Sequence, residues 1–254
     1  MTEDRRFSAL SRLFGVTANQ RIRSAHVVVV GIGGVGSWAA ESLARSGVGR
    51  ITLVDLDHVA ESNINRQIHA TVATLGQAKV VAMRERIASF FPDCNVQCID
   101  DFATPSNWLS MVPADAAAVI DACDQVTTKI CIAHWALESN KIFVTSGAAG
   151  GKRHAHRVDV DDLSHVTHDP LLAKVRYTLR RHYGAPRGDK RMHVACVYST
   201  EAVAPPDASC QVSGDGTLNC HGFGSLVTVT AAFGLCAAGY VLNQLAGQNT
   251  PGKP

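Results

Sequence analysis

The feature that most constrains the fold is a glycine-rich turn at residues 31–37, GIGGVGS. It follows an apolar, β-branched run at 26–30 and precedes a helical pattern that extends through Arg45. Glycines between a strand and a helix let backbone N–H groups approach a phosphate at the positive end of the helix. The turn therefore predicts a nucleotide site lined by Gly31, Gly33, Gly34 and Gly36, and a tight turn without a ligand is the alternative.

The alternation of strand and helix continues for most of the first half of the chain. Further strands are expected at 50–54, 96–99, 117–120 and 141–145, and further helices at 77–90, 106–111 and 125–139. Near-continuous apolar strands are typical of a parallel sheet covered on both faces. We therefore expect an α/β doubly wound, mainly parallel sheet of Rossmann type. Residues 1–151 would form its nucleotide-binding core, and 152–254 would continue the same domain.

Composition narrows the class of protein. Hydrophobic residues make up 46% of the chain, charged residues 18%, and the formal net charge is +2, which excludes collagen-like, coiled-coil and wholly disordered chains. The charge is unevenly spread, because residues 152–191 hold ten Lys or Arg against five Asp and no Glu. This segment predicts a local basic surface on an otherwise nearly neutral protein.

Location and metal content follow from the cysteines and the apolar segments. Eight widely spaced cysteines, and an N-terminus (MTEDRRF) unlike a signal or transit peptide, favour reduced thiols and a cytoplasmic protein. The uncharged run 223–242 contains Gly, Ser and Thr and lacks flanking Lys or Arg, so we expect a buried or interface helix and no membrane span. Cys94 and Cys98 have no second pair, so we expect no structural zinc.

The residues after the second strand decide between two nucleotide chemistries. Asp55 ends that strand, where a carboxylate accepts a ribose hydroxyl, and with the glycine turn alone it favours a dinucleotide oxidoreductase. The polar residues beyond it are Asp57, Asn63, Arg66, Gln67 and Lys79. Hydride transfer does not need this set, whereas nucleotidyl transfer needs fixed cations and donors for the charge that grows on the phosphates. Singly, Arg66 or Lys79 would be an ordinary surface cation.

This pattern resembles the ubiquitin-activating-like (E1-like) adenylyltransferases, and the resemblance implies ATP and Mg²⁺ as cofactors. The matching positions are the glycine turn 31–37, the ribose carboxylate Asp55, the N-x-x-R-Q element Asn63, Arg66 and Gln67, and the phosphate lysine Lys79. The segment Asp121–Asp124 resembles the family's D-x-x-D motif, and the resemblance implies that Asp124 binds the magnesium ion. As an N-cap of the following helix, Asp124 would be compatible with that role. An arginine from the partner subunit reaches the γ-phosphate in this family; Arg12 best matches its place, with Arg6 as the rival.

Over nearly its whole length the chain resembles a tRNA-modifying branch of this family. The shared segments are 37–41, 65–70, 100–102, the basic insertion, 196–201 and 222–224. The implied substrate is tRNA carrying threonylcarbamoyladenosine at position 37. Its free carboxylate would be adenylated and then attacked by the neighbouring ureido group, an intramolecular step that needs no enzyme nucleophile. Cys196, Cys210 and Cys220 remain candidates for a thioester, with buried or incidental thiols as the alternative.

The same resemblance gives the basic segment a role and suggests partners. The candidate RNA contacts are Arg176, Arg180, Arg181, Arg187, Lys190 and Arg191; a solvated helix face is the alternative. We expect a homodimer with the apolar C-terminal helix in or near its interface, and a cysteine-desulfurase sulfur-acceptor protein as a further partner. Three other functions stay open: activation of a ubiquitin-like sulfur carrier, an NAD-dependent oxidoreductase, and an idle nucleotide-binding module.

Overall fold

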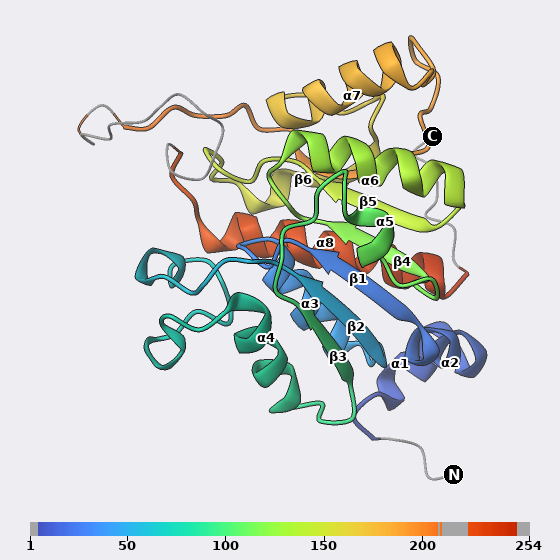
Figure 1. Ribbon diagram of the computed structural model, residues 1–254, viewed down its shortest axis with the longest axis vertical. Helices are drawn as coiled ribbons and strands as arrows, with labels where there is room; N and C mark the ends of the chain where they lie inside the picture. The colour runs from blue at the N-terminus through green and yellow to red at the C-terminus, as the bar shows by residue number, and fades with distance from the viewer. Residues whose placement is uncertain (1–4, 208, 210–222, 248–254) are drawn as a thin grey trace.

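The described part of the chain forms one seven-stranded sheet with helices on both faces (Figure 1). The computed structural model describes residues 5–207, 209 and 223–247. The strand order is β3-β2-β1-β4-β5-β7-β6, and neighbours are parallel except for the antiparallel pair β6 and β7. The strands are β1 (His26–Val30), β2 (Arg50–Val54), β3 (Asn95–Ile99), β4 (Ala118–Asp121), β5 (Ile142–Ser146), β6 (Val158–Asp162) and β7 (Ala195–Ser199).

The helices fall into two layers. They are α1 (Ser8–Phe14), α2 (Val16–Ser24), α3 (Gly36–Arg45), α4 (Lys79–Ala88), α5 (Trp108–Met111), α6 (Val126–Ser139), α7 (Pro170–His182) and α8 (Val227–Leu245), with short 3-10 turns η1 (Glu61–Asn63), η2 (Val72–Thr74) and η3 (Ala155–Arg157). Alternate side chains of a strand point to opposite faces. Val27 and Val29 of β1 accordingly join a core with α2, α3, α4 and α8, while Val28 and Val30 join a second core with α5, α6 and α7.

The predicted fold class is confirmed, and the first five strands lie within one residue of their predicted bounds. Sequence reasoning did not predict the helices α1 and α2, which are short, nor the strands β6 and β7. The sequence of β6, VDVDD, alternates valine with aspartate and gives no continuous apolar run. It nevertheless pairs with β7, which pairs with β5, so the second half of the chain extends the same sheet.

The order of the strands creates a crevice for a ligand. The chain proceeds from β1 outward through β2 to β3, and then returns to place β4 on the other side of β1. In open α/β sheets ligands bind outside the carboxyl ends of the strands at such a switch point. The turns that follow β1, β2 and β4 therefore meet at the place where a nucleotide is expected.

Helix α8 supports the glycine turn from one face of the sheet. A Cβ at Gly234 would lie 2.4 Å from the Val35 carbonyl oxygen, so glycine permits the close approach of α8 to the start of α3. By length and composition alone α8 also qualifies as a membrane span, yet 44% of its most apolar window is buried inside the protein. Helices of a protein core pass the same test, and α8 packs against α3 and β5.

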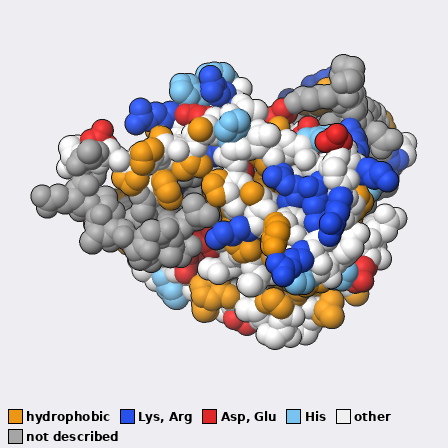
Figure 2. Space-filling model, turned by 90° about the horizontal axis from the view of Figure 1, so that it is seen from above, with side chains coloured by type: hydrophobic (Ala, Val, Ile, Leu, Met, Phe, Trp, Pro, Cys, Tyr) orange, Lys and Arg blue, Asp and Glu red, His pale blue; other side chains and the backbone are white. Residues whose placement is uncertain are grey.

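Lys and Arg side chains gather on the face that carries α7 (Figure 2). Asp169 caps this helix by accepting the Leu172 N–H at 3.0 Å, and Pro170 begins it, as is common at a helix N-terminus. The apolar face of α7 packs against α6 and the sheet, so its basic residues point outward or lie along the rim.

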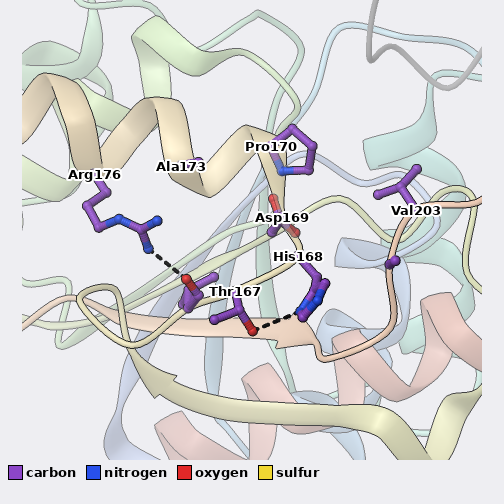
Figure 3. A pocket seen from close by; sticks show the side chains of 9 residues that line it. Thr167, His168, Asp169, Pro170, Ala173, Arg176 and Val203 are labelled. Carbon is purple, nitrogen blue, oxygen red and sulfur yellow. Dashed lines mark hydrogen bonds between the residues drawn. The ribbon is translucent and has the colours of Figure 1, made fainter.

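Two cavities lie along helix α7. The first, of about 380 Å³, lies at the beginning of the helix (Figure 3) and is lined by Val166, Thr167, His168, Asp169, Pro170, Ala173, Arg176, Ala202 and Val203. The second, of about 620 Å³, lies farther along and is lined by Ala173, Arg176, Tyr177, Arg180, Arg181 and Arg187. Ala173 and Arg176 line both, so the two cavities form one groove, called here the α7 groove.

Candidate functional site

In the glycine turn that joins β1 to α3, backbone atoms pack so closely that two of the glycines have no room for a side chain. Gly31 has φ +83°, and a Cβ there would lie 2.8 Å from the Ala122 carbonyl oxygen at the end of β4. A Cβ at Gly36 would lie only 1.8 Å from the Gly31 carbonyl oxygen. Both positions therefore require glycine for the turn itself, independently of any ligand.

The other two glycines leave space in front of the turn. A Cβ at Gly33 would meet only the Gln67 side-chain amide, at 4.0 Å. A Cβ at Gly34 would lie 3.3 Å from Arg66 Cγ and from Thr230 Cγ2 of α8. The open side at Gly33, at the N-terminus of α3, is the place where backbone N–H groups can receive a phosphate.

Asp55 is held in position beside this turn. It follows β2, is 7% exposed, and its two carboxylate oxygens accept the N–H groups of Ile32 at 2.6 Å and Asp57 at 2.8 Å. Burial raises the pKa of the Asp55 carboxyl above its ordinary value, although the nearby Lys79 charge and these two N–H donors act in the opposite direction. Each carboxylate oxygen has a further lone pair, so a ribose hydroxyl can still donate to Asp55.

Asp57 connects the predicted ribose carboxylate, Asp55, to the predicted phosphate lysine, Lys79. Lys79 begins α4, and its Nζ lies 2.6 Å from Asp57 Oδ2. The Lys79 backbone N–H also donates to the Asp57 carbonyl, at 2.9 Å. The Lys79 side chain is 8% exposed against 54% for Asp57, so a phosphate that enters at the turn competes with a solvated carboxylate for a buried ammonium group.

The N-x-x-R-Q residues lie along the other side of the turn. Asn63 is buried and its Oδ1 accepts the Ala60 N–H at 3.0 Å, which shapes η1. Trp38 Nε1 donates to the Arg66 carbonyl at 2.9 Å and so fixes Arg66 against α3. The guanidinium of Arg66 donates to the Ser62 carbonyl at 2.8 Å, and its aliphatic stem faces Gly34.

Two buried polar atoms near the turn have no hydrogen-bond partner among the described residues. They are Ser37 Oγ, at the start of α3, and Gln67 Oε1, next to Gly33. Buried polar atoms are usually paired, so such atoms point to a missing partner. Together with the open side of Gly33, they show that the residues present fit a nucleotide with its phosphates at the turn.

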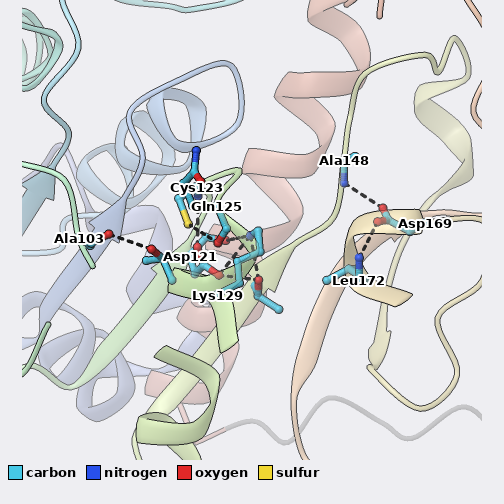
Figure 4. Close-up of polar contacts among 10 residues, drawn as sticks. Ala103, Asp121, Cys123, Gln125, Lys129, Ala148, Asp169 and Leu172 are labelled. Atoms are coloured by element: carbon cyan, nitrogen blue, oxygen red, sulfur yellow. Dashed lines mark hydrogen bonds and ion pairs between the residues drawn. The ribbon is translucent and has the colours of Figure 1, made fainter. Parts of the chain in front are cut away.

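A buried ion pair shapes the turn after β4 (Figure 4). Lys129 of α6 and Asp121 at the end of β4 are both fully buried, and Lys129 Nζ lies 3.1 Å from Asp121 Oδ2. Thr145 donates its hydroxyl to the same oxygen at 2.7 Å, and the Cys123 N–H donates to Asp121 Oδ1 at 3.2 Å. Burial disfavours the charged form of Lys129, but the charge and hydrogen bond of Asp121, together with the nearby Cys123 and Asp169, outweigh it and raise the pKa of the ammonium group.

Replacing Lys129 by methionine should lower the free energy of unfolding by about 3–5 kcal/mol, because it leaves Asp121 charged and buried without its partner. Urea titration followed by circular dichroism measures the change. In the double variant K129M/D121N the charge is removed with its partner, so part of the loss should be restored. A single variant as stable as the wild type would contradict the ion pair's structural role.

Asp124 lies beyond this ion pair and is exposed, on the carboxyl side of β4. Mg²⁺ is commonly held by one or two carboxylates together with substrate phosphates and waters. Among the residues that the structure describes, no group of three or more His, Cys, Asp or Glu is gathered as a metal site. A single accessible carboxylate at the crevice therefore fits a magnesium ion that arrives with a nucleotide.

Arg12 does not lie at this crevice within one subunit. It is exposed on α1, and α1 and α2 lie at the amino ends of the strands, since α2 ends at Ser24 just before β1 (Figure 1). The glycine turn follows the carboxyl end of the same strand. The rival Arg6 is ion-paired with Asp93 at 2.7 Å.

Of the three cysteines that are candidates for a thioester, Cys196 lies among the described residues. Cys196 lies in β7, is fully buried, and burial raises the pKa of its thiol well above the ordinary value. A nucleophilic cysteine needs a thiolate, so Cys196 is unsuited to thioester formation. Cys210 and Cys220 lie outside the described residues.

The candidate RNA contacts lie on α7 and the segment after it, away from the glycine turn. Arg176, Arg180, Arg181 and Arg187 line the α7 groove, while Lys190 and Arg191 are exposed farther along the chain. Arg176 donates to the carbonyls of Leu163 and Val166, at 3.0 and 2.7 Å. Arg180 donates to the carbonyls of Pro186 and Gly188, at 3.0 and 2.8 Å, and so fixes the loop that carries Arg187.

Sequence reasoning missed two supporting residues. Lys129 shapes the D-x-x-D turn, and its one sequence signal is a lysine within the largely apolar helical run 126–139. His69, two residues after Gln67, is 2% exposed; burial, with the charges of Lys79 and Arg86, lowers its pKa to about 4. Nothing in the sequence distinguishes this neutral buried histidine from an exposed one.

Comparisons with known proteins agree with the motifs. A model described as the ThiF family matches residues 6–253. The tRNA threonylcarbamoyladenosine dehydratase of Escherichia coli K12 is 41% identical over 94% of this chain and 93% of its own, and that of Haemophilus influenzae is 39% identical over 95% and 94%. A crystal structure of the E. coli enzyme in complex with ATP has 40% identity and a TM-score of 0.86, over 96% of this chain and 94% of that one. The resemblance inferred from the motifs is thereby confirmed.

Proposed function

The chain belongs to the ThiF family, and we propose that within this family it is an ATP-dependent tRNA threonylcarbamoyladenosine dehydratase. The observation that carries the proposal is the meeting of the glycine turn, Asp55, Lys79, Arg66 and Asp124 at one switch point of the sheet. Two relatives that bear this name, those of E. coli and H. influenzae, match the chain along more than nine tenths of its length.

Two chemical steps follow from this arrangement. First, the carboxylate of the threonylcarbamoyl group attacks the α-phosphorus of ATP, the bond from that phosphorus to the bridging oxygen breaks, and pyrophosphate leaves. Second, the ureido group of the same nucleoside attacks the acyl carbon, loses a proton and expels AMP. Because the attacking group is tethered to the activated carbonyl, ring closure benefits from a high effective molarity. The elements of one water are removed from the nucleoside overall.

The residues of the site have separate tasks. The Asp55 carboxylate accepts hydrogen bonds from the ribose hydroxyls, and backbone N–H groups at Gly33 donate to phosphate oxygens. Arg66 and Lys79 supply positive charge where negative charge grows on the α-phosphate and on pyrophosphate. Asp124 would hold Mg²⁺, which when bound neutralises charge on the phosphate oxygens.

A homodimer would complete the site. Leu13 of α1, Val16 of α2 and Leu235 of α8 are 71%, 64% and 50% exposed, and covering such side chains favours association. Arg12 lies next to Leu13 and is exposed, so we place it in this interface, as the resemblance implies for an arginine that acts on the partner subunit's nucleotide. Two predictions from the sequence stand beside this proposal. The resemblance suggests a cysteine-desulfurase sulfur-acceptor protein as a further partner, and the cysteines and N-terminal residues favour a cytoplasmic location.

AMP formation tests the proposed substrate. ATP and magnesium should yield AMP with tRNA that carries threonylcarbamoyladenosine, and not with the same tRNA lacking that group. AMP formed only when a ubiquitin-like sulfur carrier is supplied would instead favour the protein substrate of the related adenylyltransferases.

Replacing Cys196 by serine should leave most of the activity, because a buried thiol of raised pKa takes no part in intramolecular ring closure. Turnover is compared at a temperature where both proteins are folded, since a hydroxyl in this apolar place lowers stability. Complete loss of turnover in a folded C196S variant would reinstate covalent catalysis.

A further inference from the structure

The cavity at the beginning of α7 is a candidate subsite that the proposed chemistry does not use. Its walls come from two segments far apart in the sequence, residues 166–176 and residues 202–203 (Figure 3). Its volume of about 380 Å³ falls within the range of roughly 300–1,000 Å³ typical of ligand pockets.

Lys152 fixes both walls of this cavity. Its side chain is 2% exposed, and its Nζ donates to the carbonyls of His168 in one wall and Glu201 beside the other, at 3.3 and 3.1 Å. Ala204 also donates its N–H to the Gly151 carbonyl, at 2.8 Å, which holds the second wall from the far side. The cavity is therefore formed before any ligand binds, and little conformational entropy is lost on binding.

The backbone of His168 is unusual at this place. His168 has φ +56°, a left-handed conformation that residues other than glycine rarely adopt, and its ring Nδ1 lies 3.0 Å from the Thr167 hydroxyl. Such strained residues cluster at binding sites. The imidazole is exposed and forms part of the cavity lining, so it presents a flat aromatic ring to a ligand.

Charge differs sharply between the two ends of the α7 groove. The one carboxylate that lines the first cavity, Asp169, is 4% exposed and already accepts the N–H groups of Leu172 and Ala148. With a mostly apolar lining, this end suits a flat, uncharged group. The other end has four arginines in its lining and no acidic residue, which suits phosphates.

We infer that the α7 groove binds single-stranded RNA of the tRNA substrate, with an unpaired nucleobase in the His168 cavity and the sugar-phosphate chain along the arginines. This inference rests on the proposed function and specifies how its substrate is held. RNA recognition commonly uses splayed-out bases that stack on histidine or arginine planes. The base of a nucleotide is linked to its phosphate through the sugar, and the two cavities are likewise adjacent, since Ala173 and Arg176 line both.

A pair of neighbouring residues on α7 provides the test. Ala173 lines both cavities, whereas Lys174 is exposed and lines neither. Ala173→Phe fills the groove and should raise the KM for modified tRNA at least about tenfold, the effect expected when one stacked base is lost. Lys174→Phe makes the same change one residue away and should leave that KM within about twofold. The KM for ATP should stay unchanged in both.

Salt dependence tests the phosphate end with a second matched pair. Arg187→Ala removes one lining arginine and should make the slope of log affinity against log salt shallower by about 0.7–0.9, the value of one phosphate contact. Lys174→Ala removes an equal charge outside the groove and should leave the slope close to that of the wild type.

The outcomes separate this inference from the proposed function. If the wild type cyclises modified tRNA but A173F and K174F share its KM, the groove does not bind the substrate. If A173F is normal with tRNA and loses only its response to a sulfur-acceptor protein, the groove binds a protein and the inference is wrong. Failure of the wild type to act on tRNA contradicts the proposed function itself. Ala202→Phe fills the cavity from the opposite wall and replaces A173F if that variant does not fold.

Discussion

Replacing Asp124 by asparagine should lower turnover by at least about 100-fold while changing ATP affinity by less than about tenfold. The side chain is exposed at the crevice, so the substitution leaves the fold intact. Its carboxylate would hold the magnesium ion, and that ion acts mainly on charge that develops in the transition state. Single-turnover rates and calorimetric titration with ATP measure the two quantities.

Glu138→Gln is a suitable control, because Glu138 is an exposed carboxylate near the far end of α6. It should turn over like the wild type. An equal loss of affinity and turnover in D124N would contradict the assignment, since it would mean that Asp124 stabilises bound ATP and its transition state alike.

Replacing Gly33 by valine should weaken ATP binding by at least about 100-fold, because the side chain would occupy the place where a phosphate meets the backbone. The turn tolerates the change, since a Cβ there meets only the Gln67 amide at 4.0 Å. Gly33→Ala should show a smaller loss. Gly34→Val should also abolish binding, but in part by displacing Arg66, whose Cγ lies 3.3 Å from the added Cβ.

The measurement is calorimetric titration with ATP and, separately, with NAD. Thermal unfolding midpoints close to that of the wild type show that the variants are folded. Normal ATP binding by folded G33V would contradict a nucleotide at the turn, and tight NAD binding that ATP does not displace would reinstate the oxidoreductase alternative.

The residues of the candidate site that belong to short local motifs could be predicted from the sequence. The glycine turn, the predicted ribose carboxylate Asp55 and the N-x-x-R-Q element each lie directly after a strand or within a short segment, and the order of strands and helices predicts that they meet. The mainly apolar sequences of β1 and β4 also predict strands that are covered on both faces. In the structure every residue of these two strands is buried.

The part that depends on tertiary contacts was not predictable. The pairing of Lys129 with Asp121 joins residues on a helix and a strand, and no periodicity indicates that this lysine is fully buried. Arg176 and Arg180 have the spacing of an exposed basic face, yet part of each guanidinium binds backbone carbonyls. The partner of an arginine cannot be inferred from spacing alone, because the carbonyls come from loops whose path depends on the whole fold.

The mass of the nucleoside at position 37 shows whether this protein dehydrates threonylcarbamoyladenosine in tRNA. Modified tRNA is incubated with the protein, ATP and magnesium, digested under mild conditions, and the nucleosides are separated and weighed by mass spectrometry. We predict that threonylcarbamoyladenosine is converted to a product lighter by one water, with one AMP formed for each nucleoside converted. Neither D124N nor a reaction without ATP should yield that product. An unchanged nucleoside mass with the wild-type protein, under conditions where it binds ATP and the tRNA, would contradict the proposed dehydratase activity.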